Sequence, residues 1–228
     1  MRFLRYPGGK TKVLKELSAY LPSKEGIEGK YIEPFVGGGA VFFNMDPERA
    51  LLSDLNKELI DLYKGIKSYP HKVWEIFNSF PPGKESYYQI RNEDQMKKPI
   101  WYRAARTLYL NRTCFKGMWR HNQQGKFNVG YGGEERRWAI THENIIELSK
   151  RLRKTDILNL DFEKILLKVE IGDFIFLDPP YNPGDRDMKC QHYINGRFTF
   201  EDQKRLAKSL ISISKEKEEL PPKCLPTN

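Results

Sequence analysis

The stretch Phe174-Ile175-Phe176-Leu177-Asp178-Pro179-Pro180-Tyr181 decides the fold that we expect for this chain. Its four apolar residues predict a short strand, and the two prolines end that strand because they fix φ and supply no backbone N–H. The carbonyl groups of Asp178 and Pro179 therefore remain as acceptors. A carboxylate and a main-chain carbonyl can hold both hydrogens of an NH₂ group, while the Tyr181 ring offers a stacking face for a base. Residues 178–181 thus predict methyl transfer to an exocyclic amine, with a simple strand-ending turn as the alternative.

Composition limits the class of protein and its partners. The 228 residues suffice for one domain that carries an insertion. A net charge of +9 at pH 7 predicts a polyanionic partner. Three scattered cysteines favour a reducing compartment, and the histidines and cysteines lack the spacing of metal ligands. Because no apolar stretch has the length of a signal or a membrane span, we expect a cytoplasmic protein that binds neither membrane nor metal.

A strand, a glycine loop and a helix follow one another near the N-terminus. Tyr31 to Val36 predicts a strand that runs into Gly37-Gly38-Gly39, and a short helix is expected to begin at Ala40. Glycines at such a junction let a ligand approach the backbone closely. A third glycine three positions later is missing, which argues against a dinucleotide.

Two further segments flank this unit. Ala50 to Ser53 predicts a strand that ends at Asp54, which is a candidate for binding two ribose hydroxyls or for capping a helix over Lys57 to Lys67. Upstream, Tyr6-Pro7-Gly8-Gly9-Lys10 leads into a predicted helix. The start of that helix is either an anion site or an ordinary capped end. Its expected apolar face consists of Val13, Leu14, Leu17, Tyr20 and Leu21.

The composition changes from about Ile66 to Trp138. Between Trp101 and Gly133 there are six basic residues, seven interleaved aromatic residues and no acidic residue. Cations for phosphates and planar groups for bases predict a nucleic-acid surface, and a solvated basic face over a small core is the alternative. We expect a helix marked by Ile100, Ala104 and Leu108, followed by a loop that presents the reading side chains.

The α/β rhythm then returns. Asp156 to Leu160 predicts a strand that ends at Asp161, before the strand that ends at Asp178. In open parallel sheets ligands bind beyond the carboxyl ends of the strands. Asp54, Asp161, Asp178 and the glycine loop are therefore expected to converge on one crevice.

With these motifs in place, the chain resembles the bacterial and phage Dam family of DNA adenine-N6 methyltransferases of the D12 class and GATC type, from about Tyr6 to about Arg205. The resemblance implies an α/β fold with a Rossmann-like S-adenosylmethionine-dependent methyltransferase sheet and a mainly helical DNA-recognition insert. It implies a discontinuous catalytic domain of residues 1–56 and 139–228 and a target-recognition insert of residues 57–138. The implied reaction transfers a methyl group to an adenine flipped out of a GATC site in double-stranded DNA.

The resemblance also implies roles for individual residues. The catalytic residues would be Asp178, Pro179, Pro180 and Tyr181. The residues that bind S-adenosylmethionine would be Tyr6, Lys10, Phe35, Gly37, Gly39, Asp54, Asp161, Phe162 and Asp178. The DNA-binding residues would be Arg112, Phe115, Lys116, Met118, Arg120, Asn122 and Lys126. Among them, Arg120 would read a guanine in the major groove.

The chain departs from the family pattern after a predicted helix over Glu201 to Lys217, because no further strand follows. We therefore expect an incomplete sheet with the 174–177 strand at or near its edge, as in a C-terminally truncated enzyme. A catalytically impaired remnant that binds DNA or cofactor remains an alternative. So does an amino-methyltransferase acting on cytosine N4 or RNA. A cognate restriction endonuclease is a possible partner at the level of the system, and the sequence carries no signature of an oligomeric state.

Overall fold

A computed structural model describes residues 4–6, 9–10, 13–122, 124–180 and 198–218. Tyr181, the last residue of the predicted catalytic tetrapeptide, lies outside the described residues. Within these ranges no helix is long and apolar enough to span a bilayer. In the same ranges no three His, Cys, Asp or Glu side chains are grouped to hold a metal ion.

The described residues form a parallel four-stranded sheet, which confirms the predicted α/β class. Its strands are β1 (Tyr31–Glu33), β2 (Ala50–Ser53), β3 (Thr155–Leu158) and β4 (Phe174–Ile175) in the order β3-β2-β1-β4. Ile32 of β1 lies in register with Leu51 of β2 and Ile175 of β4. In this part of the chain β4 lies at an edge of the sheet, as expected.

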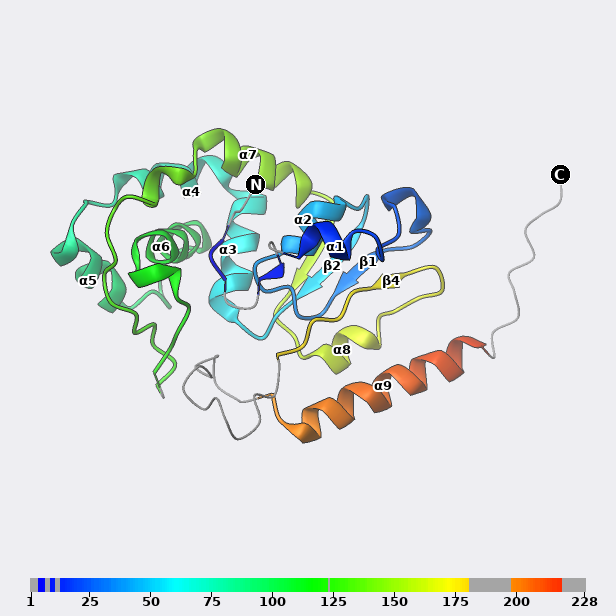
Figure 1. Ribbon diagram of the computed structural model, residues 1–228. Helices are drawn as coiled ribbons and strands as arrows, with labels where there is room; N and C mark the ends of the chain where they lie inside the picture. The colour runs from blue at the N-terminus through cyan, green and yellow to red at the C-terminus, as the bar shows by residue number, and fades with distance from the viewer. Residues whose placement is uncertain (1–3, 7–8, 11–12, 123, 181–197, 219–228) are drawn as a thin grey trace.

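Helices cover both faces of the sheet (Figure 1). The helices are α1 (Leu14–Leu17), α2 (Ala40–Met45), α3 (Lys57–Ser68), α4 (Pro70–Ser79), α5 (Lys84–Asn92), α6 (Ile100–Thr113), α7 (His142–Arg151), α8 (Phe162–Leu166) and α9 (Phe200–Glu218). Successive strand residues point to opposite faces. Tyr31 and Leu52 accordingly pack with α2 and α3, whereas Ile32 and Leu51 pack with α8 and α9.

The helices α3 to α6 do not have a core of their own. One apolar cluster runs from the sheet residue Leu52 through Leu62 of α3 to Leu108 of α6. The two helices approach closely at Gly65, where a side chain would overlap Ala104. The proposed boundaries of the recognition insert therefore cross a continuous core, and the division remains a prediction about function.

Three local expectations were wrong. The first predicted helix is only the four-residue α1, and Tyr20 of its expected apolar face is 86% exposed. The strand expected to reach Val36 ends at Glu33, directly before Pro34, which has no N–H for the ladder. The N-cap of α3 is Asn56, whose side chain accepts a hydrogen bond from the Leu59 N–H. Asp54 therefore does not cap α3.

Candidate active site

Three carboxylates gather at the carboxyl end of the sheet. Glu33 ends β1, Asp54 follows β2 and Asp178 follows β4, and parallel strands end at the same edge. Glu33 is 3% exposed and accepts a hydrogen bond of 2.8 Å from the Tyr31 hydroxyl. Burial raises the pKa of Glu33 to about 8; the bond from Tyr31 opposes this rise, and the nearby charges of Asp178 and Asp54 add to it.

Lys10 joins the N-terminal motif to the tetrapeptide. Its Nζ lies 2.7 Å from Oδ1 of Asp178, and the side chains of the two residues are 20% and 23% exposed. A cation is thus placed among the carboxylates, where it offsets part of their mutual repulsion. Lys10 and Asp178 are 168 positions apart in the sequence, and the two motifs that contain them meet at this contact.

The glycine loop lies against Asp54. Gly37 and Gly39 have φ angles of 47° and 65°, which glycine adopts without strain. Asp54 Oδ2 accepts from the Gly37 N–H at 3.0 Å, and Oδ1 accepts from the Asn56 N–H at 2.8 Å. Burial raises the pKa of Asp54 to about 6 against the lowering effect of these two bonds. The loop is also held by Tyr63, whose hydroxyl donates to the Gly37 carbonyl at 2.8 Å.

Aromatic rings border the loop on two sides. A side chain at Gly37 would lie 3.1 Å from the Tyr6 ring, and the Tyr6 and Trp119 ring centroids are 5.5 Å apart. On the other side, Phe35 contacts Phe162 with ring centroids 5.5 Å apart. The predicted cofactor residues Tyr6, Phe35 and Phe162 therefore lie beside the loop or next to one another.

Asp161 has protein partners in this structure. It is the N-cap of α8 and accepts a 3.0 Å hydrogen bond from the Glu163 N–H. It also accepts one of 3.0 Å from the Arg205 guanidinium, which lies 4.9 Å from the centre of the Phe162 ring. A cofactor role for Asp161 stays a prediction.

The recognition segment contains an antiparallel hairpin, residues 114–132, of which all but residue 123 are described. The Asn128 N–H donates to the Arg120 carbonyl at 3.0 Å, and the Asn122 N–H donates to the Lys126 carbonyl at 2.9 Å. Side chains alternate along it, so that Trp119, His121, Phe127 and Val129 are buried, while Arg120 and Asn128 lie on the other face and are half-buried.

Most predicted DNA-binding side chains lie on the outside of this hairpin. Phe115 is 48% exposed, and Lys116, Asn122 and Lys126 are exposed as well. Arg120 is half-buried, and its Nε donates to Asn128 Oδ1 at 2.9 Å.

The remaining two predicted DNA-binding residues are less accessible. Met118 is half-buried against the core. Arg112, in the last turn of α6, is 6% exposed and lines a cleft with Arg5, Lys116 and Arg136. The cleft is rich in cations, which suits a phosphate.

The residue-by-residue prediction missed three participants. Glu33 lies within the predicted strand from Tyr31 to Val36 and has no role in the prediction, although a carboxylate at the end of an apolar strand signals a site. The other two, Glu58 and His121, make a hydrogen bond of 2.9 Å across 63 positions. No local pattern reports a contact between residues so far apart in the sequence.

Comparison with known proteins places the chain in a family. Residues 6–220 match the family of D12 class N6 adenine-specific DNA methyltransferases. The type II methyltransferase M.MjaIII of Methanocaldococcus jannaschii is 34% identical over 236 residues, which cover 93% of this chain and 80% of that protein.

Two other relatives carry adenine in their names. The DNA adenine methylase of Vibrio cholerae is 32% identical over 219 residues, which cover 94% of this chain and 77% of that protein. The DNA N-6-adenine-methyltransferase of Escherichia phage P1 is 38% identical over 213 residues, covering 90% of this chain and 27% of that protein. The chain therefore belongs to the family of D12 class N6 adenine-specific DNA methyltransferases.

Proposed function

We propose that this protein transfers a methyl group from S-adenosylmethionine to N6 of an adenine in double-stranded DNA, and that the adenine lies in GATC. The proposal rests on the ion pair between Lys10 and Asp178. This pair lies at the sheet end that also holds Glu33 and Asp54. The acceptors needed for an exocyclic amine and the groups suited to a methyl donor thereby lie side by side.

The residues at the sheet end fit S-adenosylmethionine by the chemistry of their side chains. Asp54 offers acceptors for ribose hydroxyls, Lys10 a cation for a carboxylate, and the left-handed glycines a bare backbone for close approach. Phe35 and Phe162 offer apolar ring faces for a heterocycle. Together with Tyr6, Gly37, Gly39, Asp161 and Asp178, these residues would hold the cofactor. When bound, it supplies a methyl group on a positively charged sulfur.

The protein's own part in the reaction is to position and polarise the amine. N6 of adenine is weakly nucleophilic because its lone pair is delocalised into the ring. Hydrogen bonds from N6 to the Asp178 carboxylate and the Pro179 carbonyl localise this pair, and holding the base in line contributes through orientation. The N–H proton that the product amine must lose passes to Asp178, the nearest carboxylate in this scheme.

Access to the base requires that it leave the duplex. A stacked adenine cannot reach a site at a sheet end, so the base is flipped out at a cost of a few kcal/mol. Tyr181 would stack on it. We assign target reading to the insert of residues 57–138, with Arg120 on a guanine through its O6 and N7 edge and with Phe115, Lys116 and Met118 at neighbouring bases.

A labelling experiment tests the proposal. The full chain is incubated with methyl-labelled S-adenosylmethionine and genomic DNA from a strain that lacks adenine methylation, and the modified positions are mapped by sequencing. N6-methyladenine in GATC is the expected result. Label in cytosine, or in RNA supplied in a parallel reaction, would favour the alternative substrates. Cofactor binding without any transfer would favour a catalytically impaired remnant.

A further inference from the structure

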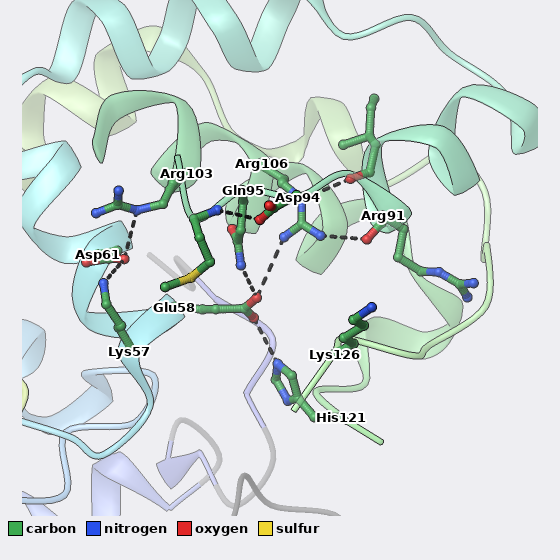
Figure 2. Close-up of polar contacts among 12 residues, drawn as sticks. Lys57, Glu58, Asp61, Arg91, Asp94, Gln95, Arg103, Arg106, His121 and Lys126 are labelled. Atoms are coloured by element: carbon green, nitrogen blue, oxygen red, sulfur yellow. Dashed lines mark hydrogen bonds and ion pairs between the residues drawn. The ribbon is translucent and has the colours of Figure 1, made fainter. Parts of the chain in front are cut away.

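Glu58 lies at the centre of a polar cluster that links three parts of the chain (Figure 2). It stands in the first turn of α3 and accepts a hydrogen bond of 2.9 Å from Nε2 of His121 in the hairpin. Arg106 of α6 forms an ion pair with it at 3.6 Å, and Gln95 donates to it from the segment between α5 and α6. Burial raises the pKa of Glu58, but His121 and Arg106 outweigh this effect, so the pKa lies below its usual range.

Arg106 makes this cluster rigid. Its Nε donates to the Ile90 carbonyl at 2.9 Å and its Nη2 to the Arg91 carbonyl at 2.6 Å. These are carbonyl groups at the end of α5, which the helix cannot satisfy itself. The Arg106 side chain is 4% exposed, and its bonds to these two carbonyl groups hold it in place beside Glu58.

His121 belongs to the buried face of the hairpin. It is buried between Trp119 and Phe127, and the ring centroids of His121 and Phe127 are 5.7 Å apart. Because side chains alternate, holding His121 inward on Glu58 holds its neighbour Arg120 outward. A slip of one residue would exchange the two faces.

The same contacts connect the hairpin to the sheet end. Asp54 binds the Gly37 and Asn56 N–H groups, Asn56 caps α3, and Glu58 follows two residues later in the same turn. The hairpin is thereby attached through His121 to the helix end that also holds the Asp54 carboxylate.

We propose that Glu58 and His121 are positioning residues for target discrimination, holding the outward face of the hairpin in register with the sheet end. The inference rests on the proposed function, since it concerns how the same enzyme selects its target. Neither residue touches the substrate in this proposal. Both act through Arg120.

The variants are chosen to keep the fold. His121→Phe preserves an aromatic ring beside Phe127 but removes the donor. His121→Gln retains an amide N–H near the position of Nε2 and should rescue. Glu58→Gln keeps the shape but removes the charge of the carboxylate that accepts from His121, and so weakens that hydrogen bond.

Asp61 provides a matched control on the same helix. It is a buried carboxylate three positions after Glu58 that pairs with Lys57 at 2.7 Å and with Arg103 of α6 at 3.0 Å. Figure 2 shows both carboxylates, and no contact to the hairpin is drawn from Asp61. Asp61→Asn therefore weakens a comparable link between α3 and α6 and leaves the His121 contact in place.

The experiment measures steady-state methylation of a GATC duplex and of duplexes with one substituted base pair. For His121→Phe and Glu58→Gln, we expect the KM for GATC DNA to rise and the preference for GATC to fall by about tenfold, the factor that corresponds to 1.4 kcal/mol. We expect kcat to stay within about twofold, and the double variant to lose no more than His121→Phe alone, since both changes act on one contact. His121→Gln and Asp61→Asn should keep the wild-type preference.

Fluorescence anisotropy measures equilibrium binding of the same duplexes. This measurement tests the positioning role separately from the proposed methyl transfer. If the wild-type chain transfers no methyl group, the proposed function fails, while the binding preference still tests the positioning role. Unchanged preference in His121→Phe and Glu58→Gln overturns the inference. So does an equal loss in Asp61→Asn, which would indicate general loosening of α3.

Discussion

The carboxylates at the sheet end and the outward face of the hairpin are held in place by different means. At the sheet end the main chain does most of the positioning: strand register places Glu33, Asp54 and Asp178, and backbone N–H groups hold Asp54. The side chain of Lys10 adds an ion pair with Asp178. On the hairpin the decisive contacts are between side chains, from Arg120 to Asn128 and from His121 to Glu58. In the proposed function, the chemistry therefore depends mainly on the fold, whereas the choice of target depends on a few replaceable side chains.

The largest effect should come from Asp178→Ala. Removing the acceptor of the amine hydrogens should lower kcat by about a thousandfold, the size seen when a polarising group or a general base is lost. Binding of S-adenosylmethionine, measured by calorimetry, should weaken far less than kcat falls, because the other residues assigned to the cofactor remain. Asp156→Ala on β3 is the matched control, because that side chain is exposed on a strand and lies outside the site. Turnover within tenfold of wild type would remove Asp178 from the mechanism.

A smaller effect, on the stability of the fold, is expected from the buried carboxyl group of Glu33. Its pKa is raised from 4.5 to about 8, so the folded state binds a proton more tightly than the unfolded state. The stability that comes from this proton is present below pH 4.5 and is lost as pH rises towards 8. We therefore expect the free energy of unfolding in urea to be higher for Glu33→Gln than for wild type, and this difference to grow by a few kcal/mol from pH 5 to pH 8. An equal difference between the two proteins at both pH values would contradict the assignment.

The smallest effect should distinguish two side chains of the hairpin. Arg120→Ala should weaken the free energy of DNA binding by about 1–3 kcal/mol and relax selection at one guanine. Lys126→Ala, a change of an exposed cation nearby, should weaken binding equally for all sequences and reduce the salt slope by about one. Filter binding across a salt series measures both. Loss of sequence preference in Lys126→Ala, or none in Arg120→Ala, would reverse the two roles.

The sequence predicted those elements whose signals are local. β2 spans Ala50–Ser53 as expected, and α2 begins at Ala40, directly after the glycine loop. The resemblance to the Dam family is confirmed by the family match over residues 6–220. These features depend on apolar runs, prolines and glycines, which act within a few residues.

What the sequence did not predict depends on contacts between distant segments. Asn56 caps α3, whereas the Asp54 carboxylate accepts a hydrogen bond from the Gly37 N–H. The short α1 falls below the length at which local propensity sustains a helix. The continuous core under the recognition insert depends on close approach at Gly65, which looks like an ordinary glycine in the sequence.

The pairing of β1 with β4 has a consequence for synthesis on the ribosome. The Lys30 N–H beside β1 binds the Asp173 carboxylate beside β4, and these residues are 143 positions apart. At about 5–20 residues per second, translation needs on the order of ten seconds to cover that distance. The basic hairpin is complete when residue 132 has been added, and Asp178 follows 46 residues later. In the proposed function, the segment assigned to DNA is therefore synthesised before the segment that carries Asp178.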